Sequence, residues 1–340
     1  MGEVAIECER WLRVRAIAEL QMNSWNQQKT YIQVPSMQRL GLAKKLWQAL
    51  RGSVLSPTYW ILAHRYDVPG LRFRIDCTLL GLQLLYSRKA PISYSDVYCL
   101  IFWPMVSVRY FEFDFMWRTL STRSFQSYLD VSSPRLFPVL VASKKRDIFA
   151  TLINPDVRDL AYTLELVESM GLESRCKLYD YRVGSAPFNS GSFEIITSMS
   201  VVEHIPEDTQ AVQKMWDLLK PGGRLLLTVP CAAHASEEYL DRDEYNLMNS
   251  NEDGYFFFQR YYDQRLLQER IFPITGQPCR YAVYGEMSPG LYRKNMDSRM
   301  SDPNYPAWRE PYMMGTEYRY FKSVNDLPGI GVIGMEFVKH

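Results

Sequence analysis

The sequence lacks an excess of charge of either sign. Its 340 residues include 39 lysines and arginines against 38 acids, a formal net charge of +1. A chain without an overall positive field has no general attraction for nucleic acid or anionic lipid. It also lacks a basic patch interleaved with aromatic residues, the usual mark of an RNA or DNA acceptor. Small or neutral partners are therefore expected, and no nucleic acid.

Paired cysteines and long apolar runs are also missing. The six cysteines form no CxxC motif and have no metal-type spacing, as is typical of buried thiols in a reducing compartment. The apolar run 97–108 is interrupted by Pro104 and is too short to span a bilayer. Residues 1–15 carry acids and arginines where a signal peptide needs a basic end and an apolar core. We expect a cytoplasmic protein with no stable membrane insertion.

Short apolar runs alternate with helical patterns between about residues 127 and 230. Continuous apolar runs are typical of parallel strands that helices cover on both faces. An amphipathic pattern at 157–170 ends at Gly171, and a second helix is predicted between the last two runs. Alternation of this kind predicts an α/β fold with a doubly wound parallel sheet. Its strands are expected at 127–131, 147–153, 177–181, 193–199 and 224–229.

Polar residues follow the ends of these runs. In doubly wound sheets, ligands bind beyond the carboxyl ends of the strands. Candidate ligand-facing residues at these ends are Asp130, Asn154, Pro155, Asp180, Tyr181, Glu203 and His204. The sequence Pro221-Gly222-Gly223 then ends a helix and turns the chain back into the sheet.

Residues 109–230 resemble the class I S-adenosylmethionine-dependent methyltransferases, in particular the group with E-H-I/V-P after the fourth strand. The motifs that carry the resemblance are Asp130, Asn154-Pro155-Asp156, Asp180, the segment 187–194, Glu203-His204-Ile205-Pro206 and K-P-G-G-R at 220–224. The resemblance implies S-adenosyl-L-methionine as the cofactor. It also implies a Rossmann-like sheet of seven strands whose last pair, at 280–287 and 331–340, is antiparallel.

The first loop departs from the family pattern G-x-G-x-G. This chain has Ser132-Ser133-Pro134-Arg135-Leu136, so the glycines are replaced and Pro134 removes an N–H donor. The hydroxyls and amides of Ser132 and Ser133 could hold the cofactor carboxylate instead. Arg109, in an R-x-x-E segment before the first strand, could pair with the same carboxylate through a charge-assisted fork. The alternative is that Arg109 is a surface arginine.

The resemblance implies further cofactor contacts. Asn154 stands where the family has the acid that binds the ribose hydroxyls, and Asp156 is the alternative. Pro155 and Met199 are also expected to contact the cofactor. Asp180 would bind the adenine amino group and Tyr181 would stack on the ring, unless the pair is ordinary turn chemistry.

Three residues are candidates for catalysis. His204 could act as the general base, or could instead cap the following helix. His234 is a second candidate base. The alternative is that it is an exposed histidine in a polar loop. Glu203 and His204 also resemble a magnesium-assisting pair, but Ser200 stands where an additional acid is found, so no metal is expected.

We therefore expect a mostly helical N-terminal cap or oligomerisation region at 1–108, supported by helical spacing at 7–21 and 71–86. Residues 109–340 would form the methyltransferase domain, with an insert at 235–270 and a lid-like segment at 288–328. The predicted activity is methyl transfer to an O or N atom of a small molecule such as a natural product, sugar or lipid intermediate. A homodimer is one option for its assembly. The alternative is a non-catalytic methyltransferase-fold protein that serves as a binding or assembly subunit.

Overall fold

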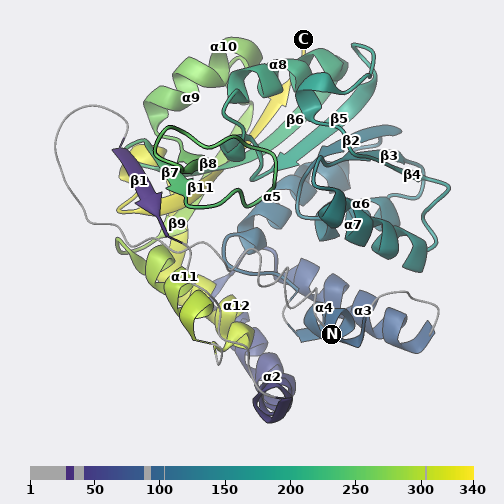
Figure 1. Cartoon of the computed structure of the whole chain (residues 1–340). Coiled ribbons are helices and arrows are strands. Elements are labelled where there is room, and N and C mark those ends of the chain that lie inside the picture. Colours follow the sequence, from purple (N-terminus) through teal and green to yellow (C-terminus); the bar gives the residue numbers. More distant parts are fainter. Residues whose placement is uncertain (1–27, 34–41, 88–92, 103, 303–304) are drawn as a thin grey trace.

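The computed structural model describes residues 28–33, 42–87, 93–102, 104–302 and 305–340. The helical pattern expected at 7–21 lies outside these residues. Within them, a central sheet has helices on both faces, and a smaller sheet and a helical cap lie beside it (Figure 1).

The central sheet has the strand order β10-β9-β11-β6-β5-β2-β3-β4. Strands β2 to β6 run parallel, while β11 is antiparallel to both β6 and β9. This arrangement confirms the predicted α/β class and the antiparallel strand pair at its end. The strands are β2 (Ser127–Val131), β3 (Phe149–Ile153), β4 (Cys176–Tyr179), β5 (Phe193–Met199), β6 (Leu219–Ala232), β9 (Arg280–Glu286), β10 (Tyr318–Phe321) and β11 (Ile330–Val338).

The sheet has one strand more than the seven expected. Strand β10 pairs antiparallel with β9 at the edge of the sheet. Its four residues lie within the segment that the sequence analysis treats as lid-like, and two of them are exposed. A strand this short and this exposed has little hydrophobic patterning, which is why the sequence gives no sign of it.

Helices cover both faces of the sheet, and their apolar side chains form two buried clusters. Residues of α5, α6 and α7 contribute to one buried cluster, and residues of α8 and α9 contribute to the other. Local signals fix the ends of α7, because Asp156 caps its first turn and Gly171 follows its last turn with φ +65°. The helices are α5 (Arg109–Thr122), α6 (Leu136–Lys144), α7 (Val157–Ser169), α8 (Asp208–Leu218), α9 (Gln264–Arg270) and α10 (Phe272–Thr275).

The N-terminal region is mostly helical where it is described, in agreement with the predicted cap. It contains α2 (Leu42–Ala63), η1 (His64–Tyr66), α3 (Leu71–Ser87) and α4 (Tyr94–Phe102). It also supplies a strand, β1 (Gln28–Ile32), which pairs parallel with β7 (Ser236–Leu240) in a three-stranded sheet completed by β8 (Phe256–Tyr261). The segment 235–270 therefore shares its sheet with β1, a strand from the N-terminal region of the chain.

Residues 288–328 fold into packed elements. These are α11 (Leu291–Ser301), η4 (Ala307–Arg309), α12 (Glu310–Glu317), β10 and η5 (Val324–Asp326). Inside this segment Glu310, which is 2% exposed, pairs with Arg299 and accepts a hydrogen bond from Tyr305. Because a buried carboxylate is stable only while it keeps such partners, these contacts hold the segment together. A lid function for it stays a prediction. Among the described residues, no helix is both long and apolar enough to cross a membrane.

Candidate functional site

A cavity of about 620 Å³ opens beyond the carboxyl ends of β2, β3 and β5. Strand β2 lies between β3 and β5, so the cavity sits where the strand order reverses, the usual ligand position in such sheets. Its volume is in the range of small-molecule sites. The walls come from the sheet loops, the cap helix α4, the insert and α11.

The first loop keeps a glycine-like backbone without glycine. Ser132 has φ +53°, in the left-handed region, and both its N–H and its hydroxyl donate to the carbonyl of Ile153 at 2.9 and 3.1 Å. The Ser133 amide donates to Asp130, and the Ser133 hydroxyl accepts from the amide of Met199, both at 3.0 Å. The two serine amides proposed for the cofactor carboxylate therefore donate within the protein.

These hydrogen bonds distinguish the residues that line the cavity from those that support the first loop. Ser132 lines the cavity, whereas Asp130, Ser133 and Met199 lie behind it and hold the loop to β2 and β5. Asp130 is buried and also accepts from Thr197 and Tyr128. Burial raises the pKa of Asp130 to about 6, against these hydrogen bonds.

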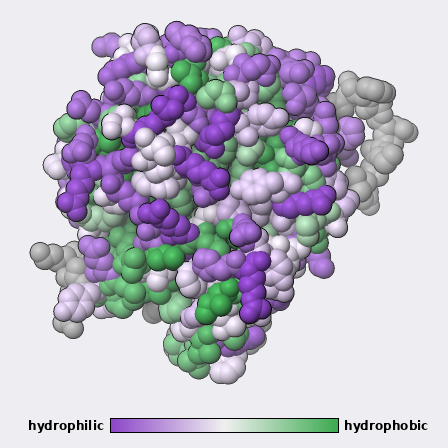
Figure 2. All heavy atoms as spheres, turned by 180° about the vertical axis from the view of Figure 1, so that it is seen from behind, coloured by the Kyte–Doolittle hydropathy of each residue, from purple (hydrophilic) through white to green (hydrophobic). Residues whose placement is uncertain are grey.

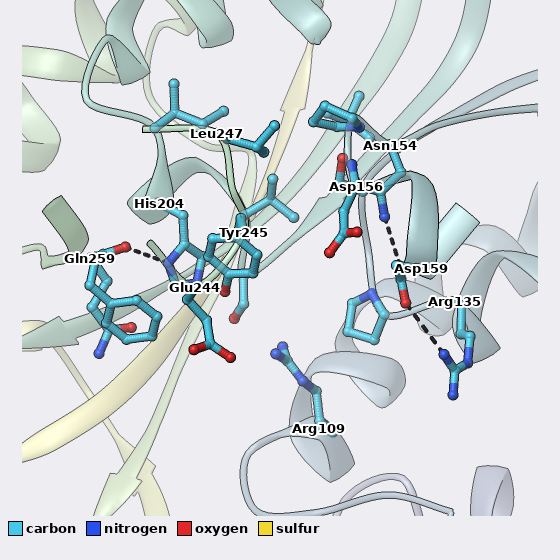
Figure 3. A pocket seen from close by; sticks show the side chains of 18 of the residues that line it. Arg109, Arg135, Asn154, Asp156, Asp159, His204, Glu244, Tyr245, Leu247 and Gln259 are labelled. Carbon is cyan, nitrogen blue, oxygen red and sulfur yellow. Dashed lines mark hydrogen bonds and ion pairs between the residues drawn. The ribbon is translucent and has the colours of Figure 1, made fainter. Parts of the chain in front are cut away.

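Asn154, Pro155 and Asp156 form one wall of the cavity, together with Asp159 and Arg135 (Figure 3). The Asn154 amide donates to Asp159 at 2.7 Å, and its carbonyl accepts the backbone N–H of Asp156 at 3.0 Å. Arg135 lies 3.4 Å from the other oxygen of Asp159. Sequence reasoning missed Asp159, which stands in the first turn of α7 and carries the carboxylate that Asn154 lacks.

Arg109 is buried at the floor of the cavity and is 7% exposed, so it is no surface arginine. It forms an ion pair with Glu112, one helical turn further along α5, at 2.5 Å. Glu112 is fully buried and also accepts hydrogen bonds from Ser200 and from Thr228. These contacts fix the carboxylate, which in turn orients the guanidinium beside the cavity.

His204 lines the cavity opposite Asn154 (Figure 3). Glu203 does not line the cavity. The His204 Nδ1 lies 2.6 Å from the Phe258 carbonyl, so Nδ1 carries the proton and Nε2 is the basic nitrogen. Burial lowers the pKa of His204 to about 4, so the ring is neutral near pH 7. The contact ties His204 to β8, and no side chain caps α8.

Glu203 is buried behind His204, with its Oε1 3.8 Å from the His204 Nε2. Burial holds the pKa of Glu203 well above its usual value. Its other oxygen finds no hydrogen-bond partner among the described residues.

Three predicted site residues lie away from the cavity. Asp180 and His234 are exposed, and Tyr181 stacks on Tyr179 with ring centroids 5.3 Å apart. Strand β4 ends at Tyr179, at the edge of the sheet, and the chain returns to the cavity only at residues 182–185. The adenine roles of Asp180 and Tyr181 and the catalytic role of His234 stay predictions.

The wall facing Asn154 comes from the insert, which sequence reasoning did not assign to the site. Glu244, Tyr245 and Gln259 lie there beside His204 (Figure 3). Glu238, which is 2% exposed, pairs with Arg293 of α11 and accepts from Gln259 at 2.5 Å. The signal available in the sequence is the acidic pair in β7, SEEYL, because acids in a strand are buried only with partners.

Comparison with known proteins finds a match to the family model described as "Methyltransferase domain" over residues 140–227. This match runs from within α6 to within β6 and agrees with the resemblance to methyltransferases stated from the sequence. Residues 140–227 are thus similar to a methyltransferase domain.

Two curated relatives are both named O-methyltransferases. The chain is 43% identical over 75 residues to "Ubiquinone biosynthesis O-methyltransferase" of Xanthomonas oryzae pv. oryzae, covering 21% of this chain and 31% of that protein. It is 35% identical over 81 residues to "Probable tocopherol O-methyltransferase, chloroplastic" of Oryza sativa subsp. japonica, covering 22% of each. The chain therefore spans about a third or less of the length of these relatives.

Similarity to solved structures is distant. Geranyl diphosphate C-methyltransferase from Streptomyces coelicolor matches with a TM-score of 0.45 and 10% identity, over 74% of this chain and 82% of that one. The [4+2]-cyclase SpnF matches with a TM-score of 0.41 and 16% identity, over 66% and 79%.

Proposed function

We propose that this protein is an S-adenosylmethionine-dependent methyltransferase that acts on an O or N atom of a small-molecule acceptor. The observation that carries the proposal is Arg109, a buried arginine held by Glu112 at the floor of a cavity beyond the strand ends of a methyltransferase domain. A buried cation facing a cavity is suited to an anionic group of a ligand.

The residues around this cavity fit the cofactor. Arg109 would hold its amino-acid carboxylate, in place of the serine amides that donate within the loop. Asn154, Asp156 and Asp159 present amide and carboxylate groups suited to ribose hydroxyls. Ser132 lines the cavity with the left-handed backbone conformation that glycine usually adopts. When bound, S-adenosylmethionine supplies a methyl group on a sulfonium centre.

The chain's own residues would then orient the acceptor and exclude water. The aromatic side chains Tyr245 and Phe258 pack around His204 and provide an apolar wall for an acceptor. Because its ring is neutral at physiological pH, His204 can accept the proton of an acceptor hydroxyl at Nε2. Alignment of the acceptor atom supplies most of the remaining rate enhancement.

Calorimetric titration of the full chain with S-adenosylmethionine tests the proposal. We expect saturable binding that Arg109→Gln weakens at least about tenfold, because one charge-assisted contact is lost. Arg118→Gln is the matched control, since Arg118 lies on the same helix with its side chain 67% exposed. Arg109→Lys keeps the charge next to Glu112 and serves if the glutamine variant does not fold.

Absence of heat and of any thermal shift at millimolar S-adenosylmethionine would overturn the proposal. It would favour the alternative, a non-catalytic methyltransferase-fold protein that works as a binding or assembly subunit. Equal losses of affinity in Arg109→Gln and Arg118→Gln would show that the carboxylate assignment is wrong.

A further inference from the structure

Arg293 is a second arginine that lines the cavity and is held by a buried glutamate. It lies in the first turn of α11, and its guanidinium pairs with Glu238 of β7, which is 2% exposed. Charged side chains are ordinary on the outer surface, where hydrophilic residues cover much of the upper part of the molecule (Figure 2). A charge placed inside a cavity against a buried carboxylate has a desolvation cost, so it is more informative. Arg109 and Glu112 form the same arrangement at the cavity floor.

The guanidinium of Arg293 is fixed but only partly used. Its Nη2 donates to one oxygen of Glu238. The other oxygen of Glu238 accepts from Gln259 at 2.5 Å and from the Tyr261 hydroxyl at 3.4 Å. Within the described part of the chain, Arg293 makes no other side-chain hydrogen bond. Since a guanidinium carries five N–H donors, most of its donors are left for a ligand.

Tyr292, the preceding residue, adds a hydroxyl to the same wall. It lines the cavity, and its hydroxyl has no hydrogen-bond partner among the residues that the structure describes. Burial raises the pKa of Tyr292, so the phenol stays a hydrogen-bond donor at neutral pH. The charges of Arg109 and Arg293 act on this pKa in the opposite direction, as expected of a phenol that lies near both guanidinium groups.

The acids on this wall already have partners. Both oxygens of Glu238 accept hydrogen bonds, Glu244 forms an ion pair with Arg242 at 3.3 Å, and Asp297 also has an interaction partner. The groups left for an ionic ligand are therefore the guanidinium and phenol donors, which suit a carboxylate. A phosphate fits less well. S-adenosylmethionine carries a net single positive charge, which balances one negative charge in the cavity and leaves the second charge of a phosphate uncompensated.

We propose that the acceptor is a carboxylic acid whose carboxylate binds Arg293 and Tyr292, while the atom to be methylated, a hydroxyl or an amine, lies beside His204. Strand β8 connects the two positions, because Gln259 bonds the partner of Arg293 and the preceding carbonyl bonds His204. The inference rests on the proposed methyltransferase function and specifies its substrate class.

Calorimetric titration of the full chain with three acid and amide pairs tests this inference. The acids are para-hydroxybenzoate, para-hydroxyphenylacetate and omega-hydroxydecanoate, each with its neutral amide, with and without saturating S-adenosylhomocysteine. We expect at least one acid to bind at least about tenfold more tightly than its amide. Arg293→Gln should reduce this ratio to about two or less, and Tyr292→Phe should reduce it about threefold. Arg265→Gln is the matched control and should keep the ratio, because Arg265 pairs with Glu269 on α9 and does not line the cavity.

The cofactor titration separates this inference from the proposed function. Arg293→Gln should bind S-adenosylmethionine like wild type, whereas Arg109→Gln should lose cofactor affinity and keep the preference for the acid. A preference for the acid in a chain that binds no cofactor would refute the methyltransferase proposal and leave the carboxylate site supported.

Thermal melting of each variant guards against unfolding. The double variant Glu238→Gln, Arg293→Gln removes both buried charges and replaces Arg293→Gln if the single variant does not fold. Cofactor binding without a preference for any of the three acids would overturn the inference. So would an unchanged preference in Arg293→Gln, an equal loss in Arg265→Gln, or a loss of cofactor affinity in Arg293→Gln with the preference intact, since that last result would assign Arg293 to the cofactor.

Discussion

Two serines at the strand ends occupy backbone conformations that usually select glycine. Ser132 follows β2 with φ +53°, and Ser200 follows β5 with φ +50°. A left-handed conformation costs a non-glycine residue about 1–3 kcal/mol. Both hydroxyls are bonded, that of Ser132 to Ile153 and that of Ser200 to Glu112, so the loops keep their shape through side chains.

Ser132→Gly should be more stable than Ser132→Ala by about 1 kcal/mol, because both lose the hydroxyl and only glycine relieves the backbone. Urea unfolding measures the difference. Ser53 provides the control, since it lies in the interior of helix α2, where alanine should be the more stable replacement by about 1 kcal/mol. The same order at both positions would contradict the strain argument.

The buried ring of His204 predicts an acid-sensitive contribution to stability. The folded pKa is about 4 against an ordinary value of 6.5, so protons bind the unfolded state more tightly between these values. This contribution is fully present above pH 6.5 and is lost as pH falls toward 4. It amounts to on the order of 3 kcal/mol.

Urea unfolding between pH 4 and 7 checks this prediction. His204→Asn should show a flatter pH dependence than wild type. The exposed His234 is the matched control, and His234→Asn should keep the wild-type curve. Parallel curves for wild type and His204→Asn would indicate that His204 titrates normally in the folded protein.

At the level of elements, the strands that build the sheet were predictable because burial on both faces leaves a continuous apolar run. The expected bounds of β2 and β5 agree with the structure residue for residue, whereas β4 ends at Tyr179, two residues before the expected end. The cavity wall that contains Tyr245 and Gln259 could not be predicted. It depends on how the insert folds over the sheet, and no local pattern encodes that placement.

The insert is joined to the sheet domain by a buried charge cluster centred on Asp208. This carboxylate, 1% exposed at the start of α8, accepts from Arg260 of β8 at 2.7 Å, from Tyr262 at 2.6 Å and from Arg270 of α9. Burial alone would raise the pKa of Asp208, but hydrogen bonds from Arg270 and Tyr262 and the charge of Arg260 lower it below its usual value. The insert and α8 are therefore expected to unfold together.

Asp208→Asn should destabilise the protein by about 3 kcal/mol, because it removes the buried carboxylate that pairs with both Arg260 and Arg270, while Arg260 keeps Glu237 as its other partner. Asp114→Asn is the control, since its partner Arg118 is exposed on α5 and such pairs contribute about 0.5 kcal/mol. Urea unfolding compares the two. Similar small losses would show that the cluster contributes no more than a surface pair.

On the scale of the whole molecule, the cavity joins parts of the chain that are distant in sequence. Its walls combine the cap helix α4, the strand ends and the segment 241–255 of the insert. That segment has no helix or strand, and its contacts with the sheet domain include a hydrogen bond from the Arg182 guanidinium to the Leu247 carbonyl at 2.9 Å and the packing of Tyr245 on His204. A ligand that fills the cavity would therefore order this segment more than any element of the sheet.

If S-adenosylmethionine binds there, a concentration of about 100 times its dissociation constant should stabilise the protein by about 2.7 kcal/mol. Amide hydrogen exchange in 241–255 should slow by up to about 100-fold, because local opening then requires loss of the ligand. The turn at 322–329, which does not line the cavity, is the internal control and should change little. Arg109→Gln should reduce the protection at least about tenfold at the same cofactor concentration. Uniform slowing of exchange along the chain would instead indicate that the ligand acts only through global stability, and the segment would then have no particular part in enclosing it.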